Sequence, residues 1–346
     1  MIGNTNIQNG LDPRKERLRL IANRYLPNED KLPIDCTWEQ LIQVFDSYDE
    51  YSYMNAFLNS IEVFPDKDYS INDTEGHIKG LRNYAFYGNT ALKSLKLNGI
   101  NAINESWNNQ LLYCGSLKEL SLGCSSVNIT SFNVNILPSL SKLAKLSFPN
   151  LLTVTLARGE IGVGTAITEL YMPRLNSYTT SAVAATSFFD SPALSNLNLP
   201  SLETFNFGSS GKFIKSTAPS LKTMLFGSVD FTCGSFGISN TNTASLQAMI
   251  YTGQSKLATL SNSTLVNEII DTTDVIIYVP STLLSTYQSA TNWALINDTK
   301  PIQDIESHIN SLRELGADFS FTSYANRKWE NNQLVDDPTI GEEVDE

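Results

Sequence analysis

Leucine and other large apolar residues recur from residue 92 onward in a Leu-x-x-Leu-x-Leu pattern. The first residues of successive patterns lie 24 to 27 residues apart through seven cycles. Such regular spacing indicates an internal repeat, and a repeat constrains the fold more than any single motif does. The seven cycles are Leu92-Leu95-Leu97, Leu117-Leu120-Leu122, Leu143-Leu146-Phe148, Ile167-Leu170-Met172, Leu194-Leu197-Leu199, Leu221-Met224-Phe226 and Leu246-Met249-Tyr251.

The second half of each pattern alternates apolar and polar residues, which is typical of a short strand with one buried face. One cycle is too small to bury that face alone, so successive cycles must stack on one another. We therefore predict a fold between α/β and mainly β, a leucine-rich-repeat solenoid of stacked parallel short strands over residues 78–280. The predicted repeat core consists of Leu92, Leu95, Leu97, Leu117, Leu120, Leu122, Leu143, Leu146, Leu170, Leu194, Leu197 and Leu221.

Three cycles run from the strand directly into a proline, at Pro149, Pro173 and Pro200. Proline has no N–H to donate to a sheet and therefore ends the strand. We expect the chain to turn at each proline to the other side of the coil. Two further features mark the cycles: Ala85-Phe86 precedes the first, and Cys114 stands three residues ahead of the second.

Together these residues resemble the BspA-like leucine-rich repeats of bacterial surface proteins and of some phage proteins. The resemblance covers about residues 78–302 and includes a closing stretch in which Val279-Pro280 precedes Tyr287 and Trp293. The Ala-Phe pair is intact only at residues 85–86 and the cysteine only at residue 114. The resemblance implies a surface-presenting array that binds or holds another macromolecule.

Residues 1–77 lack the repeat and predict a helical region. Asp12 is placed to cap one helix, and Thr37 to begin a second. This region is interpreted either as an N-terminal cap for the repeats or as a separate attachment domain.

Two segments follow the repeats. Residues 281–302 predict a capping helix, with Ser281 as its N-cap, that covers the open edge of the last coil. Residues 303–346 predict a C-terminal extension: a helix from Ile305 to Leu315, a strand-like alternation from Phe319 to Tyr324, and an acidic tail.

Charge and composition exclude several classes of partner. The chain has 346 residues, a formal net charge of −12 and only 17% charged residues. Nucleic acids and anionic membranes both require clustered lysine and arginine, so neither is an expected partner. The N-terminal residues carry charges where a signal peptide has an apolar core, and no stretch is apolar enough to span a bilayer. We therefore expect a protein made in the host cytoplasm without a signal peptide.

No pattern typical of catalysis is found. The two histidines, His77 and His308, have no partner pattern for a triad or a zinc site. The four cysteines include no Cys-x-x-Cys pair and are interpreted as buried free thiols, with a Cys114–Cys124 bridge as the alternative in an oxidising environment. We expect no enzyme, no cofactor and no metal site.

The outward positions of the strands form the predicted binding surface. Tyr171 and Tyr251 are assigned to it, because tyrosine offers a large contact area and a polar tip for recognising proteins or carbohydrates. The leading hypothesis is a structural protein of a phage virion, in a tail, baseplate or head appendage. Its partners would be other virion proteins, in an oligomeric assembly, and a host-surface protein or glycan. The alternatives are a bacterial adhesion or scaffolding protein and, third, an enzyme acting on surface glycans.

Overall fold

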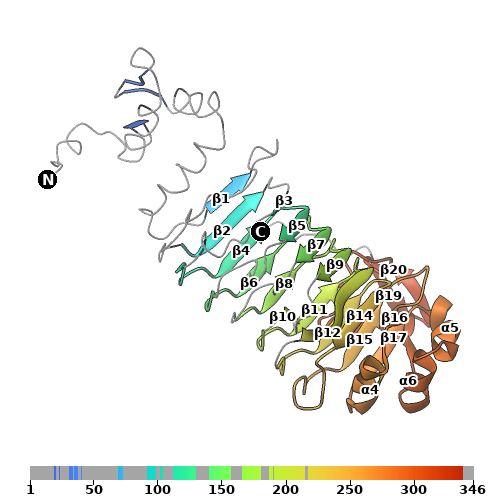
Figure 1. Cartoon of the computed structure of the whole chain (residues 1–346). Helices are drawn as coiled ribbons and strands as arrows, with labels where there is room; N and C mark the ends of the chain where they lie inside the picture. The colour runs from blue at the N-terminus through green and yellow to red at the C-terminus, as the bar shows by residue number, and fades with distance from the viewer. Residues whose placement is uncertain are drawn as a thin grey trace.

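In a computed structural model, the described part of the chain consists mostly of parallel strands in stacked sheets, with few helices (Figure 1). Among the described residues, ten strands form one sheet, eight form a second, and two pair as an antiparallel hairpin. The structure describes residues 19–20, 23, 31–33, 35–37, 40, 69–72, 92–98, 102–103, 111, 113–129, 140–156, 166–180, 187–189, 191–214 and 217–337.

The ten-stranded sheet contains the strands of the Leu-x-x-Leu-x-Leu pattern. Each strand pairs in parallel with the strand one cycle further along, so that Leu95 pairs with Leu120 and Leu120 with Leu146. Its first strand falls before the expected boundary at residue 78. In order, the strands are β1 (Tyr69–Asn72), β2 (Ser94–Asn98), β4 (Glu119–Leu122), β6 (Lys145–Ser147), β8 (Glu169–Tyr171), β11 (Asn196–Leu199), β13 (Thr223–Phe226), β15 (Ala248–Tyr251), β17 (Ile276–Val279) and β18 (Gln303–Asp304).

A second sheet, which the sequence pattern did not predict, follows the same order on the other side of each cycle. Pro149, Pro173 and Pro200 each lie between a strand of the first sheet and a strand of the second, which confirms the expected turns. The eight strands are β3 (Ala102–Ile103), β5 (Ser126–Ile129), β7 (Thr153–Leu156), β9 (Ser177–Thr180), β10 (Ser187–Phe189), β12 (Thr204–Ile214), β14 (Asp230–Ser235) and β16 (Thr259–Leu260).

One hydrophobic core joins the two sheets. The predicted core leucines are at most 1% exposed, except Leu170, which is only partly buried against the core and to that extent departs from the prediction. On the side of the eight-stranded sheet, the core is filled by aromatic rings. The rings of Phe205 and Phe207 stack at 4.6 Å, and Tyr178 stacks on Phe207 at 5.0 Å. Stacked aromatic rings stabilise a core by more than the burial of their area alone.

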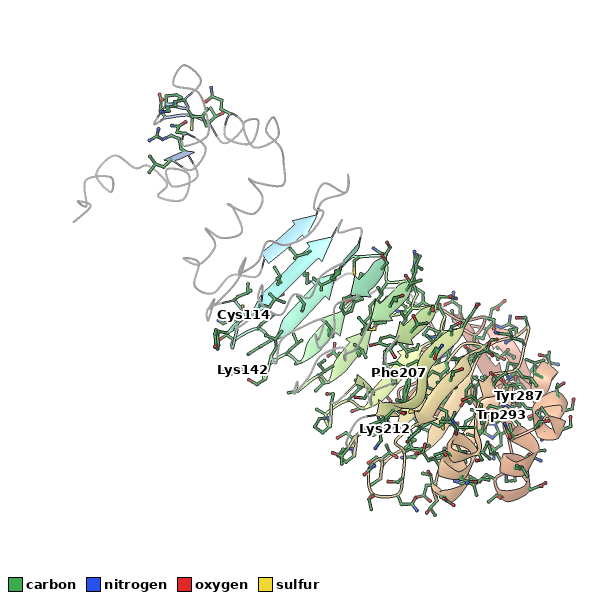
Figure 2. All side chains as sticks on the ribbon, viewed as in Figure 1. Cys114, Lys142, Phe207, Lys212, Tyr287 and Trp293 are labelled. Atoms are coloured by element: carbon green, nitrogen blue, oxygen red, sulfur yellow. The ribbon has the colours of Figure 1, made fainter. Side chains whose placement is uncertain are left out.

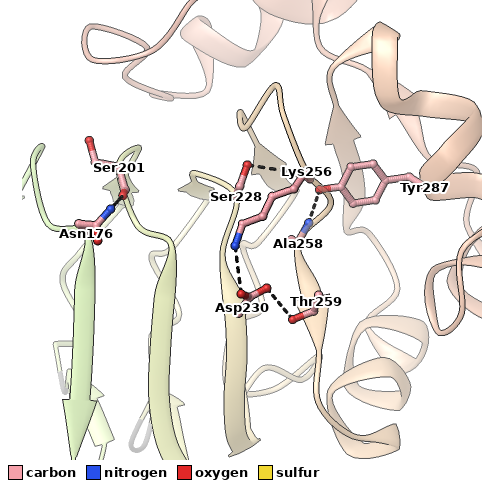
Figure 3. Close-up of polar contacts among 8 residues, drawn as sticks. All are labelled: Asn176, Ser201, Ser228, Asp230, Lys256, Ala258, Thr259 and Tyr287. Atoms are coloured by element: carbon pink, nitrogen blue, oxygen red, sulfur yellow. Dashed lines mark hydrogen bonds and ion pairs between the residues drawn. The ribbon is translucent and has the colours of Figure 1, made fainter.

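The outer face of the eight-stranded sheet is polar. The register places Thr155 beside Thr179, and Thr153 beside Ser177. Near the C-terminal end of this face, Lys256 Nζ lies 3.0 Å from Asp230 Oδ2, and Thr259 Oγ1 donates to Asp230 Oδ1 at 2.8 Å (Figure 3). These polar contacts link side chains of neighbouring cycles on this face.

Three α-helices close the C-terminal end of the array (Figure 1): α4 (Ser263–Asp271), α5 (Leu284–Ser289) and α6 (Trp293–Thr299). Tyr287 and Trp293 face inward there (Figure 2), and both bond to Ala258: the Ala258 N–H donates to Tyr287 Oη at 2.8 Å, and Trp293 Nε1 donates to the Ala258 carbonyl at 2.8 Å. Burial and these bonds hold the helices against the last strands.

The single capping helix expected over residues 281–302 is instead split. A 3-10 helix, η4 (Ser281–Leu283), precedes α5, and the extended Ala290 and positive-φ Asn292 (φ 71°) separate α5 from α6. The prediction that Ser281 is the N-cap is wrong, because Pro280 occupies that position without a side-chain cap. The backbone N–H of Ser281 donates instead to Glu306 Oε2 at 2.9 Å.

The predicted C-terminal extension starts with β18, the last strand of the ten-stranded sheet, so the sheet runs past the expected boundary. Next come η5 (Glu306–His308) and α7 (Ile309–Glu314), inside the helix predicted over 305–315. Gly316 follows at a φ of 103°, a conformation that suits glycine at a helix end. The predicted strand from Phe319 to Tyr324 is wrong, since this stretch forms turns in which Thr322 N–H donates to the Phe319 carbonyl at 3.0 Å. A hairpin of β19 (Arg327–Glu330) and β20 (Gln333–Asp336) follows.

Most of the N-terminal region, including Asp12, lies outside the described residues, as do His77, Ala85-Phe86 and the acidic tail. At Thr37, however, two reciprocal hydrogen bonds form a capping box. The Gln40 N–H donates to Thr37 Oγ1 at 3.1 Å, and the Thr37 N–H donates to Gln40 Oε1 at 2.7 Å. These bonds support the predicted helix start at Thr37.

Candidate binding surface

The outward side chains of the ten-stranded sheet form two rows that cross the strands. In the first row, Glu119, Lys145 and Glu169 are neighbours in register, and Lys145 Nζ lies 3.2 Å from Glu169 Oε2. In the second row, Ser121 and Ser147 lead to Tyr171. The side chains of this half, from β2 to β8, are exposed or half-buried, with Ser94 as a buried exception. We call this half of the outer face, from β2 to β8, the open half.

The same rows continue into β11, β13, β15 and β17, where the outward positions are covered. Leu225 and Ile250 stand in the row of Ser147 and are fully buried, although both face away from the main core. They belong to a second hydrophobic cluster that residues 305–324, here called the covering segment, complete. The cluster contains Leu225, Ala248, Ile250 and Tyr278 from the sheet, and Ile305, Ile309, Leu312, Ala317, Phe319 and Tyr324 from the covering segment.

Polar contacts fix the covering segment in place. The Tyr324 hydroxyl donates to Glu306 Oε1 at 2.8 Å and accepts from Gln254 Nε2 at 2.9 Å. The guanidinium of Arg313 donates to the backbone carbonyls of Tyr324 and Ala325, at 2.8 and 3.1 Å, and lies over the Phe319 ring at 5.5 Å. These groups lock the turns that bring Phe319 and Tyr324 onto the sheet.

Tyr171 lies where the open half meets the covering segment. It faces outward as predicted and is 41% exposed. The ring of Phe321, itself 43% exposed, meets it edge-on at 6.1 Å between centroids and 68° between planes. Burial and then the nearby Asp318 carboxylate raise the pKa of Tyr171, whereas Arg174 lowers it. Tyr171 therefore sits among an aromatic ring, an acid and a base.

The sequence reasoning missed three of these neighbours. Asn198 pairs in register with Tyr171, and its Oδ1 accepts the Asp318 N–H at 3.2 Å. Phe321 and Asp318 come from far along the chain, so no local pattern could place them here. Only the register of Asn198 was available from the repeat spacing.

The assignment of Tyr251 to the outward surface is wrong. Tyr251 pairs with Phe226 in register, is 0% exposed, and meets the Trp293 ring at 5.2 Å. It occupies the third apolar position of its cycle, so the alternation that turns Tyr171 outward turns Tyr251 inward. Its hydroxyl has no hydrogen-bond partner, and burial raises its pKa well above the ordinary value.

The cysteines and the histidine of the described residues do not lie on the open half: the cysteines are buried, and His308 belongs to the covering segment, where its ring lies 5.3 Å from that of Tyr278. Cys36, Cys114, Cys124 and Cys233 are buried free thiols, and burial raises the pKa of both Cys124 and Cys233 to about 12. His308 Nδ1 lies 3.0 Å from the Asp304 carbonyl and 2.9 Å from Ser307 Oγ. Within the described ranges, no three His, Cys, Asp or Glu side chains gather as a metal site would require.

Comparison with known proteins gives no family for the chain. No protein-family model matches the sequence, and no curated protein is significantly similar to it. Among the residues whose structure is described, no helix has the length and apolar character needed to cross a bilayer.

Proposed function

We propose that the chain is a non-enzymatic interaction protein whose stacked sheets are the two walls of a leucine-rich-repeat solenoid. One observation carries the proposal: the outer face of a single regular sheet is covered over one half and exposes ordered polar rows over the other. An ordered, exposed surface on a rigid sheet is suited to binding, because little conformational entropy is lost when a partner docks.

We further propose that the protein is a component of a phage virion and that the open half binds a host-surface molecule or another virion protein. The resemblance of the repeats to surface-protein arrays supports this assignment, as does a net charge of −12, which disfavours nucleic acid as the partner. In the open half, the inward alternation of the cycles also leaves the outer positions free to vary without disturbing the core.

The test is binding of the purified chain to intact host cells and to virions, measured by co-sedimentation. Ser147→Arg places a long charged side chain in the middle of the open half, and Thr155→Arg makes the matched change on the outer face of the eight-stranded sheet. We expect Ser147→Arg to abolish sedimentation with cells or particles and Thr155→Arg to leave it unchanged. Wild-type protein that sediments with neither cells nor particles contradicts the proposal.

A further inference from the structure

The exposed pair of Tyr171 and Phe321 is built from two segments that are distant in sequence. Tyr171 ends β8, whereas Phe321 belongs to the covering segment, and their rings meet at 6.1 Å while both remain more than two-fifths exposed. Single exposed apolar side chains are common on protein surfaces. Two rings held together where the open half of the sheet ends make a contiguous aromatic platform instead.

Polar groups surround this platform on several sides. Asn198 is the register neighbour of Tyr171, and the amide nitrogen of its side chain takes no part in the bond that its Oδ1 accepts from Asp318. Asp318 and Arg174 lie close enough to Tyr171 to act on its hydroxyl with opposite charge effects. Glu169, on the same strand as Tyr171, is paired with Lys145. Acids and bases therefore balance around the rings.

On one side of the platform, the neighbouring outward positions carry small side chains. The row that ends at Tyr171 holds Ser147 and then Ser121 in the two preceding strands. Their small hydroxymethyl side chains rise little above the sheet and offer hydrogen-bonding groups at each strand. A chain-like ligand anchored on Tyr171 has room to continue across β6 and β4.

We propose that Tyr171 and Phe321 form a carbohydrate-binding platform, on which the apolar C–H face of a sugar ring packs while Asn198 and Asp318 bond its hydroxyls. This inference rests on the proposed function and names the chemical class of the ligand at the same surface. A sugar presents one apolar face and a rim of neutral hydroxyls, which matches an aromatic pair ringed by amide and carboxylate groups.

Other ligand classes fit this platform less well. A phosphate-bearing ligand requires an excess of positive charge, whereas Arg174 and Lys145 are here offset by Asp318 and Glu169. A protein interface needs a wider apolar centre than two rings provide. The balanced charge and small aromatic area therefore favour a neutral saccharide.

The experiment measures binding of the full chain to a panel of short neutral oligosaccharides of hexose and N-acetylhexosamine, by ligand-detected NMR and then by calorimetry. We expect Tyr171→Ala and Phe321→Ala each to weaken binding about tenfold or more, the loss that roughly 1.4 kcal/mol produces. Tyr171→Phe, which keeps the ring, should weaken it less than Tyr171→Ala. Leu295→Ala removes another exposed apolar side chain, on α6, and should change nothing.

Two results overturn the carbohydrate proposal: no saccharide of the panel binds, or binding survives in both alanine variants. Its failure is separable from that of the proposed function. Cell binding that resists periodate but is lost after protease treatment of the cells identifies a protein ligand, which refutes the sugar platform and keeps the interaction role. Saccharide binding by a chain that sediments with neither cells nor virions supports the platform and refutes the proposed virion role.

Discussion

The two halves of the outer face of the ten-stranded sheet share one backbone and one register but differ in what stands on it. Ser147 in β6 and Ile250 in β15 occupy the same row, yet the first is half-buried beside exposed polar neighbours and the second is fully buried. Parallel strands with one solvated face alternate, whereas strands buried on both faces are apolar throughout. The outward side chains of one row, polar in one half and apolar in the other, therefore separate the part of the sheet that faces solvent from the part that the covering segment packs against.

The cover also makes the stability of the two halves depend on different contacts. The inward residues of both halves share the main core, but the outward residues of β13 and β15 depend on contacts with residues more than fifty positions away in sequence, in the covering segment. The covered half is therefore expected to respond strongly to changes in either partner. Apart from Tyr171, whose ring meets Phe321, the described outward residues of the open half have no such partner, and their positions should tolerate substitution.

The largest expected difference between the halves comes from one charged substitution made at the same row. Ile250→Asp buries a carboxylate in the second cluster and should cost more than about 4 kcal/mol of unfolding free energy or prevent folding. Ser147→Asp should change it by less than about 0.5 kcal/mol. Urea unfolding followed by circular dichroism measures both, and equal costs would refute the division into halves.

A smaller effect is expected when the covering segment itself is weakened. Phe319→Ala removes a ring that is 2% exposed and should destabilise the docked segment by roughly 3 kcal/mol. Phe321→Ala, two residues along, should cost less than about 1 kcal/mol, because Phe321 is 43% exposed. Hydrogen exchange gives the readout: residues 305–324 and the outer positions of β13 and β15 should exchange faster in Phe319→Ala, with β4 and β6 unchanged.

The repeat spacing was sufficient to predict which leucines stack and that the strands are parallel. Because each cycle repeats the same three apolar positions, Leu95, Leu120 and Leu146 must take equivalent places. The second sheet was less evident, since its strands are short and vary in sequence from cycle to cycle. The turn that leads to each of them was nevertheless marked by proline.

The candidate surface was predictable only in part. Alternation alone places Tyr171 outward and, applied consistently, places Tyr251 inward. The covered half also had a local signal, because β13 and β15 are buried at every position and read Thr-Met-Leu-Phe and Ala-Met-Ile-Tyr. Such runs indicate strands buried on both faces. The identity of the cover could not be predicted, because Phe319 and Tyr324 reach the sheet through turns held by tertiary contacts.

A third prediction concerns the hydroxyl of Tyr324, which bonds Glu306 and Gln254 within the covered half. Tyr324→Phe should lower the unfolding free energy by about 1 kcal/mol near neutral pH. Burial raises the pKa of Tyr324 above its ordinary value, with the bonded Glu306 acting in the same direction. The ordinary pKa of tyrosine, about 10, applies to the unfolded chain. The stabilisation that accompanies the raised pKa of the folded state is therefore fully present below about pH 10 and is lost as the pH rises through the folded-state pKa.

The pH dependence provides the check on this assignment. The stability gap between wild type and Tyr324→Phe should be constant up to about pH 10 and then narrow, because only the wild type can lose the Tyr324 proton on unfolding. Urea unfolding at a series of pH values measures the gap. A gap that widens above about pH 10 would mean that the hydroxyl is ionised in the folded protein.

The smallest effect is expected for the ion pair of Lys145 and Glu169 on the open half. Their side chains are 49% and 61% exposed, so solvent screens the attraction between them. Both side chains also lose rotamer freedom when they pair. A double-mutant cycle with Lys145→Ala and Glu169→Ala should therefore give a coupling energy of about 0.5 kcal/mol or less, decreasing with added salt. The Lys256–Asp230 pair on the eight-stranded sheet, at 46% and 46% exposure, is the matched control, although Thr259 also bonds Asp230. A coupling above about 1 kcal/mol for Lys145 and Glu169 would mean that the open half is stabilised by its own surface charges. The contrast with the covered half would then lie in the kind of outward contact rather than in its presence.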